Sequence, residues 1–303
     1  MEKTEILLEA GTNEIEIMKF NICGDTYGIN VAKVREIILS EPLKPMPGAH
    51  EMVEGIFKPR NKVLAVIDLP RYITGEKQEK HEKDLFLITY FNKMDIAFRV
   101  DEVLGIERLS WTQVKPIDKT LHNGETGMAT GIAEIGDDFV VVLDFERIVA
   151  DIIKEVTLDV DSVKTVKSEE REKYTLLIAE DSELLAKLML EALDKSGYTN
   201  YIRFNNGQEL WEYLNTIEED EIETKANLII TDIEMPQMDG HHLTKLVKTS
   251  TKYKHIPLVI FSSILSDEMK KKGEELGADE QLTKPEIVNL VGLIEKLLTF
   301  WDN

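Results

Sequence analysis

The second half of the chain alternates apolar, strand-like runs with amphipathic helical stretches, and this alternation restricts the fold more than any other feature. Strand-like runs occur at 174–179, 200–204, 227–232, 257–262 and 280–284, and helical stretches at 182–197, 207–217, 240–250, 267–277 and 286–300. Such alternation is typical of βαβ units, in which helices cover both faces of a parallel sheet. We therefore predict an α/β doubly wound domain with a five-stranded parallel sheet over residues 173–303.

The first half, residues 1–150, has a different pattern. Strand-like runs occur at 15–23, 25–30, 62–69, 84–91, 93–103 and 138–145, and short turns separate several of them. Only two short stretches, 30–39 and 49–57, are read as helical. This pattern predicts a β-rich domain of antiparallel sheet closed into small barrels. Residues 151–172, which end in the polar run SEEREK, are predicted to finish a helix and then form a linker.

Composition excludes several classes of protein. The formal net charge of −21 argues against a protein that binds a phosphate backbone, because such proteins carry basic patches. No apolar stretch approaches the roughly 18 residues of a membrane span. The N-terminus has no basic flank followed by an apolar core, so no signal peptide is expected and the default location is cytoplasmic. The single cysteine, Cys23, cannot form an internal disulfide and is expected to be at least half-buried.

Polar side chains stand at the ends of four of the five predicted parallel strands. Glu180 and Asp181 follow the first strand, Asp232 the third, Ser262 ends the fourth, and Lys284 follows the fifth. Taken one at a time, these residues could simply cap helices or open turns. Taken together, they gather at one edge of the sheet, where ligands of such folds bind.

Three clustered carboxylates repel one another unless a cation lies between them, and carboxylate oxygens suit Mg²⁺. A hydroxyl and an amine beside them suit the oxygens of a phosphoryl group. The set therefore predicts phosphoryl transfer onto a carboxylate. Asp232 is the expected acceptor because it follows the central strand.

Residues 173–303 resemble the receiver domain of response regulators. The resemblance rests on Glu180-Asp181, on Asp232 with the following MPQMDG, on Ser262 and on Lys284-Pro285. It implies that Asp232 is the phospho-acceptor and that Glu180, Asp181, Asp232 and the backbone carbonyl of Glu234 bind Mg²⁺. It also implies that Ser262 and Lys284 bind the phosphoryl group. One departure is Gln281, which stands where receivers often carry a tyrosine or phenylalanine that changes rotamer.

Residues 15–150 resemble the CheW-type chemotaxis coupling domain. The matching stretches are FNICGDTYGINVAKVREII, PMPGAHEMVEGIFKPRNKVLAVIDL, AFRVDEVLGIERL and GIAEIGDDFVVVLDFERI. The resemblance implies two small β-barrels that bind a chemoreceptor's cytoplasmic tip and a histidine kinase's regulatory domain. It assigns receptor binding to Val34, Glu36 and Arg60, although Pro59 and Asn61 replace the usual neighbours of that arginine. For Glu36 and Arg60 the alternative is an ordinary solvated surface charge.

A coupling domain followed by a receiver is the arrangement of CheV-type chemotaxis proteins. This resemblance implies a non-enzymatic adaptor, recruited to membrane-associated receptor arrays and modulated by phosphorylation from the kinase. Three alternatives stay open. The chain could be a constitutive scaffold, a phosphate sink, or a response regulator whose first half is an enzyme or a DNA-binding domain. The acidic charge argues against DNA binding, and residues 1–150 show no cluster of acid and base side chains.

Overall fold

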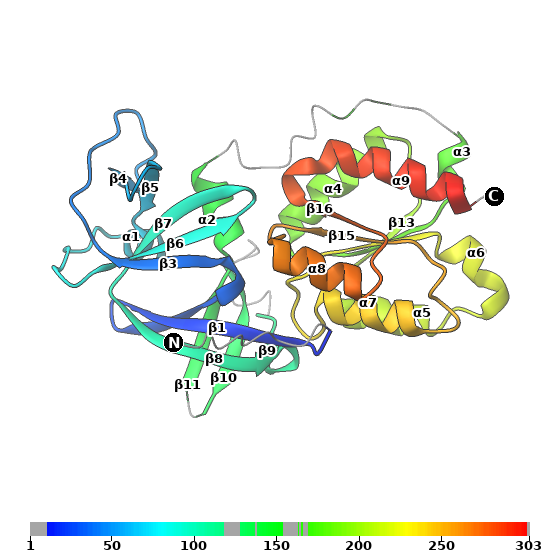
Figure 1. Cartoon of the computed structure of the whole chain (residues 1–303), viewed down its shortest axis with the longest axis horizontal. Coiled ribbons are helices and arrows are strands. Elements are labelled where there is room, and N and C mark those ends of the chain that lie inside the picture. Colours follow the sequence, from blue (N-terminus) through cyan, green and yellow to red (C-terminus); the bar gives the residue numbers. More distant parts are fainter. Residues whose placement is uncertain are drawn as a thin grey trace. The chain divides into compact units, whose positions relative to one another are not determined.

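The computed structural model describes residues 11–117, 128–136, 138–153, 163, 165 and 169–301, which form two compact units (Figure 1). The N-terminal unit comprises the described residues of 15–109 and 113–156. The C-terminal unit comprises the described residues of 157–303 together with 11–14 and 110–112. Most of the predicted linker lies outside the described residues. In the described part of the chain, no helix combines the length and apolar character needed to cross a membrane.

The N-terminal unit is β-rich, as predicted. One sheet has the strand order β8 (Glu102–Ser110), β1 (Glu14–Ile22), β2 (Asp25–Asn30), β11 (Asp138–Leu143), β10 (Ala129–Ile135), β9 (Val114–Lys115). The other has the order β3 (Val34–Leu39), β6 (Leu85–Phe91), β7 (Met94–Val100), β5 (Leu64–Ile67), β4 (Val53–Phe57). The helical segments of this unit are η1 (Val31–Lys33), α1 (Leu69–Thr74) and α2 (Phe145–Ile152), whereas η2 (Trp111–Gln113) is divided between the two units.

Each of these sheets contains a parallel pair, which the prediction of antiparallel sheet does not include. Strand β11 pairs with β2, and β5 pairs with β7. The other pairings with a resolved register, such as β1 with β2 and β6 with β7, are antiparallel. The parallel partners are distant in the chain, so no tight turn between them marks the pairing in the sequence.

The prediction of helix for residues 30–39 and 49–57 is wrong over a large part of both stretches. Residues 34–39 form β3, and residues 53–57 form β4. In β3, exposed and half-buried side chains alternate, which is the period of a strand. Cys23 is also exposed, contrary to expectation, because it lies in the left-handed region (φ 53°) of the turn between β1 and β2.

The C-terminal unit confirms the predicted doubly wound fold. The parallel sheet has the order β13 (Tyr201–Phe204), β12 (Leu176–Ala179), β14 (Leu228–Thr231), β15 (Leu258–Ser262), β16 (Glu280–Thr283). Helices α4 (Glu183–Lys195) and α9 (Ile287–Trp301) cover one face, and α5 (Gly207–Leu214), α7 (Gly240–Thr249) and α8 (Asp267–Glu275) cover the other (Figure 1). The short segments α3 (Glu169–Glu172), η6 (Glu219–Glu221), α6 (Ile222–Lys225) and η7 (Lys284–Glu286) complete the unit.

Side-chain caps fix where the covering helices begin. The side chains of Ser182, Asn206, Asp239 and Ser266 accept hydrogen bonds from backbone N–H groups in the first turns of α4, α5, α7 and α8, respectively. Each cap satisfies an N–H group that has no partner inside its helix. Because the helices start directly after the strand–helix loops, these caps also hold the loops at the carboxyl edge of the sheet.

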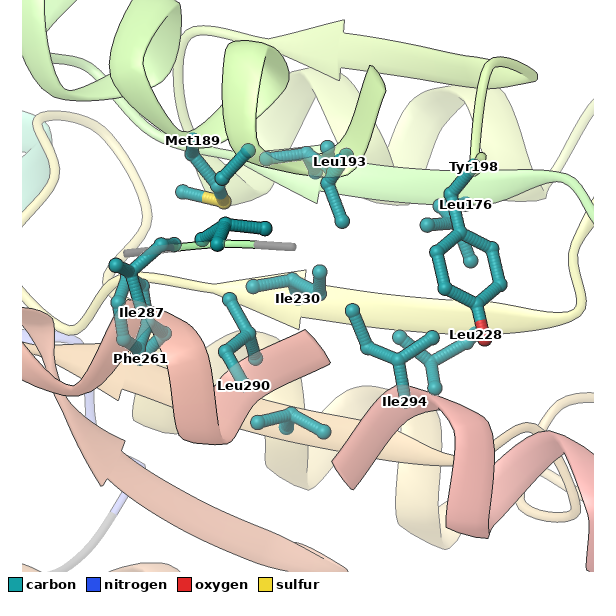
Figure 2. Close-up of a cluster of buried hydrophobic side chains, with 14 of the residues drawn as sticks. Leu176, Met189, Leu193, Tyr198, Leu228, Ile230, Phe261, Ile287, Leu290 and Ile294 are labelled. Atoms are coloured by element: carbon teal, nitrogen blue, oxygen red, sulfur yellow. The ribbon is translucent and has the colours of Figure 1, made fainter. Parts of the chain in front are cut away.

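The core of this unit lies between the sheet and the pair α4 and α9 (Figure 2). Met189 and Leu193 of α4 face Ile230 of β14, and Leu290 and Ile294 of α9, which covers the same face of the sheet (Figure 1), belong to the same cluster. All five side chains are buried. Burial of each stabilises the fold by about 1.5–3 kcal/mol, so the strands that carry the polar edge are held rigidly.

Candidate functional site

The predicted polar residues of the second half meet at the carboxyl edge of the parallel sheet. Glu180 and Asp181 follow β12, and Asp232 follows β14. Ser262 is the last residue of β15 and pairs in register with Thr283, which directly precedes Lys284. The side chains at the four strand ends lie together at the carboxyl edge of the sheet because these strands are parallel and adjacent.

Three carboxylates form a compact acidic group within the described residues. Glu180, Asp181 and Asp232 each offer an oxygen, and these oxygens lie within 4.8 Å of one another. Glu180 is fully buried, and Asp232 is 3% exposed. Carboxylate oxygens at such separations fit the ligand preferences of Mg²⁺, which neutralises their repulsion.

Lys284 supplies positive charge to this acidic group. Its Nζ lies 2.7 Å from Asp232 Oδ2 and 3.2 Å from Glu180 Oε2. Lys284 is itself 3% exposed, so the pairing takes place away from water, where it is strong. The ammonium and the Asp232 carboxylate are therefore close enough to share one phosphoryl group.

Ser262 has a buried hydroxyl whose Oγ makes no hydrogen bond within the described residues. A buried hydroxyl without a partner costs free energy, so its persistence needs a reason. A hydroxyl at the same sheet edge as Asp232 and Lys284 is ready to donate to an incoming oxygen. This observation fits the role that the sequence predicts for Ser262.

The loop after Asp232 returns unusually close to the Asp232 backbone. A Cβ on Gly240 would lie 1.8 Å from the Asp232 carbonyl oxygen, so only glycine fits there. The Ile233 N–H donates to Asp232 Oδ1 at 2.6 Å. Glu234 lies two residues beyond Asp232 and is buried, and the role of its carbonyl as a metal ligand stays a prediction.

Sequence reasoning missed Asn13, a residue of the C-terminal unit that holds this loop. Its amide nitrogen donates to the Gln237 carbonyl at 2.7 Å, and its amide oxygen accepts from the Asp239 N–H at 2.9 Å. Asn13 precedes the loop by more than 200 residues in the chain, so no local pattern could reveal the contact. Sequence reasoning also missed Arg203, which contacts the loop after β12 from the neighbouring strand β13, 23 residues further along the chain.

Gln281 holds β16 to α8. Its Nε2 donates to the Lys270 carbonyl at 2.7 Å, while its buried side-chain oxygen has no hydrogen-bond partner in the part of the chain that the structure describes. A Cβ on Gly273 of α8 would lie 2.2 Å from that oxygen. A hydrogen-bonded amide therefore stands where many receivers carry an aromatic ring, and a side chain at position 273 would displace that amide.

We expect Gly273→Ala to affect stability differently with and without the Gln281 side chain. In a Gln281→Ala background, the change should stabilise the fold by roughly 0.5–1 kcal/mol, because alanine favours helix. In the natural background, the displaced amide loses a hydrogen bond worth about 1 kcal/mol, so that gain should disappear. Urea unfolding of the four proteins measures the coupling, and additive effects would show that the two side chains do not interact.

His241 of α7 is buried, and its Nε2 has no hydrogen-bond partner within the described residues. Burial, reinforced by the charge of Lys272, lowers the pKa of His241 to about 4. Nearby, burial raises the pKa of Asp239 to about 6. Below pH 6.5 the unfolded chain binds a proton at His241 that the folded chain does not, and the resulting loss of stability is complete at about pH 4.

Replacing His241 by leucine should therefore make the C-terminal unit more resistant to acid. The stability of the variant relative to the natural protein should rise as pH falls from 6.5 to 4, by up to about 3 kcal/mol. Asp239 contributes in the opposite direction, since its protonation below pH 6 stabilises the fold, but this contribution is common to both proteins. Unfolding free energies at several pH values test this expectation, and a difference independent of pH would contradict it.

In the N-terminal unit, the structure brings together two of the three residues assigned to receptor binding. Arg60 Nη2 lies 2.8 Å from Glu36 Oε1, and the Arg60 side chain is 81% exposed. Glu36 lies on β3, which begins at Val34. Arg60 adopts a left-handed conformation (φ 57°) in the turn after β4. The two charges thus form an accessible pair on the surface.

Comparison with known proteins supports a two-part chain. Residues 16–152 match the CheW-like domain, and residues 176–295 match the response regulator receiver domain. The chain is 30% identical to chemotaxis protein CheV3 of Helicobacter pylori, with 94% of this chain and 95% of that protein covered. It is 28% identical to CheV2 of the same organism, with 95% and 96% covered. A receiver domain structure from a Syntrophus aciditrophicus histidine kinase is 29% identical, with a TM-score of 0.37, and the match covers 41% of this chain and 89% of that one.

Proposed function

The chain belongs to the CheV family, in which a CheW-like domain is joined to a receiver domain, and on this premise we propose that it is a chemotaxis adaptor. Its N-terminal domain would couple chemoreceptors to a histidine kinase at receptor arrays. Its receiver would accept a phosphoryl group on Asp232, and the change would alter coupling. The observation that carries the proposal is the 2.7 Å pairing of Lys284 with Asp232 inside a group of three carboxylates.

The chemistry would proceed by direct transfer between side chains. An Asp232 carboxylate oxygen forms a bond to the phosphorus of the donor phosphohistidine while the phosphorus–nitrogen bond breaks. The donor imidazole keeps the electron pair and takes up a proton. Bound Mg²⁺ would neutralise the negative charge that accumulates on the phosphoryl oxygens.

The residues around Asp232 would hold the phosphorylated state. Lys284, which pairs with Asp232 in this structure, would transfer its hydrogen bond to a phosphoryl oxygen. Ser262 would donate its unpaired hydroxyl to another phosphoryl oxygen. Glu180 and Asp181 would remain as cation ligands together with Asp232 and the Glu234 carbonyl. These shifts would change the loops after β14 and β15, which gives phosphorylation a structural consequence.

For the N-terminal domain, we propose that Val34, Glu36 and Arg60 contact the cytoplasmic tip of the receptor. The exposed Glu36–Arg60 pair contributes at most about 1 kcal/mol to stability, so altering it should leave the fold intact. In reconstituted complexes of receptor signalling fragments and kinase, Arg60→Glu should reduce the kinase activity that depends on this chain by tenfold or more. Lys115→Glu, which alters another exposed ion pair of the same domain, is the matched control.

The same reconstitution tests the regulatory part of the proposal. Kinase activity supported by the natural chain should change when the receiver is phosphorylated, and the Asp232→Asn variant should couple without that response. An equal response from both proteins would indicate a constitutive scaffold. Failure of the natural chain to couple receptor and kinase at all would refute the adaptor function.

A further inference from the structure

Arg203 binds the backbone of the two residues that begin the acidic group. It lies on β13, opposite Ile178 of β12 in the parallel register. Its Nε and Nη2 donate to the Glu180 carbonyl oxygen at 3.2 and 3.1 Å, and Nη2 also donates to the Asp181 carbonyl oxygen at 3.3 Å. A single planar guanidinium therefore holds two successive peptide groups.

These contacts occur where the chain leaves the sheet. β12 ends at Ala179, and α4 begins only after its cap residue Ser182, so the carbonyls of residues 180 and 181 lie in the connecting loop. A carbonyl in such a loop needs a partner from elsewhere. Arg203 provides it with a rigid, charged donor whose hydrogen bonds are stronger than those between neutral groups.

Charge alone would make Arg203 unfavourable beside a cation site. A guanidinium close to the acidic group repels a divalent cation and weakens its binding. Its donors, however, point at carbonyl oxygens, and no ion pair between Arg203 and a carboxylate occurs among the described residues. Arg203 thus has two opposite effects on Mg²⁺ affinity. Its hydrogen bonds fix the loop, which favours Mg²⁺ binding, and its charge repels the cation, which disfavours it.

We propose that Arg203 is a positioning residue for the metal site, which fixes the Glu180–Asp181 backbone so that both carboxylates stay aimed at the cation. This inference rests on the proposed function, since it assumes that the acidic group binds Mg²⁺. Groups that orient metal ligands typically affect metal affinity by 10- to 100-fold. For Arg203, the gain in Mg²⁺ affinity from fixing the loop is larger than the loss from charge repulsion.

Titration of the full-length chain with Mg²⁺ in a calorimeter tests the proposal. Arg203→Met keeps the aliphatic stem but removes all donors, and it should weaken Mg²⁺ binding about tenfold. Lys187→Met removes the same charge from the same surface groove, where Lys187 and Arg203 both lie. It should leave Mg²⁺ affinity unchanged or slightly increased. Arg203→Lys has a single ammonium in place of the guanidinium. Its Mg²⁺ affinity should lie between those of the natural protein and Arg203→Met.

The outcomes separate this inference from the proposed function. If the natural chain binds no Mg²⁺, the proposed metal site is wrong, and the role of Arg203 is refuted with it. If the natural chain binds Mg²⁺ and Arg203→Met binds it equally or more tightly, only the positioning role is refuted. A lowered unfolding temperature with unchanged affinity would likewise show that Arg203 is merely structural. If Arg203→Met does not fold, natural affinity in Arg203→Lys would overturn the proposal.

Discussion

Replacing Arg99 by methionine is expected to destabilise the N-terminal unit by about 3–5 kcal/mol, because it leaves the buried carboxylates of Asp68 and Asp84 without their cation, while Glu54 keeps its ion pair with Lys80. Arg99 lies on β7 and is 1% exposed. Its guanidinium binds Glu54 at 2.5 Å, Asp68 at 2.5 Å and Asp84 at 3.3 Å. The side chains of these three acids are all at least 94% buried. A loss of this size is a large fraction of the stability of an ordinary domain.

The loss should also depend on pH. Burial already raises the pKa of Asp68, against the lowering effects of the hydrogen bond from the Arg71 N–H and of the Arg99 charge. Without Arg99 that pKa should rise further, so protonation at low pH relieves the unpaired charge. The destabilisation should therefore be larger at pH 8 than at pH 5.

Unfolding of the full-length chain in urea, followed by hydrogen exchange in β6 and β7, measures this effect. The control is Lys115→Met, which breaks an exposed pair with Glu134 and should cost less than 1 kcal/mol. Similar losses in the two variants would show that the buried cluster is not the main stabilising interaction of this sheet.

Replacing Lys284 by methionine is expected to destabilise the C-terminal unit by about 3 kcal/mol when Mg²⁺ is absent. The change leaves the buried carboxylates of Glu180 and Asp232 together without the ammonium that now pairs with both. A cation bound at the acidic group should restore much of the loss, because binding to the folded state alone stabilises it. Mg²⁺ should thus raise the unfolding temperature of the variant more than that of the natural protein.

Thermal unfolding with and without Mg²⁺ tests this second expectation. Lys296→Met, which breaks an exposed pair with Glu280, serves as the control and should show neither effect. If Lys284→Met and the natural protein were equally stable in the absence of Mg²⁺, repulsion among the carboxylates could not be the cause of the expected loss.

The sequence revealed the architecture of the C-terminal unit and the gathering of its polar residues because both depend on local patterns. Runs such as 228–231 are buried on both faces, and the acidic residues follow them directly. Parallel topology then determines where the side chains meet. The position of Lys284 beside Asp232 followed from this rule without any knowledge of distances.

The features that sequence reasoning missed depend on contacts between distant segments. The apolar residues of β3 also fit a helical spacing, so the sequence predicts a helix there, whereas the structure pairs this segment with β6 as a strand. The partners of Arg99 lie 15 to 45 residues away in the chain, on β4 and in the segments that precede α1 and β6. The contact of Gln281 with α8 likewise follows from the packing of a helix on an edge strand.

The central claim is that Asp232 accepts a phosphoryl group from a histidine kinase, and phosphotransfer measures it most directly. The kinase is labelled with radioactive phosphate and mixed with the full-length chain and Mg²⁺, and peptide mapping locates the label. We expect the natural chain and an Asp267→Asn control, altered at an exposed position of α8, to take up label, and Asp232→Asn to take up none. Label that reaches Asp232→Asn as efficiently as the natural chain, or a natural chain that takes up none, would contradict the claim.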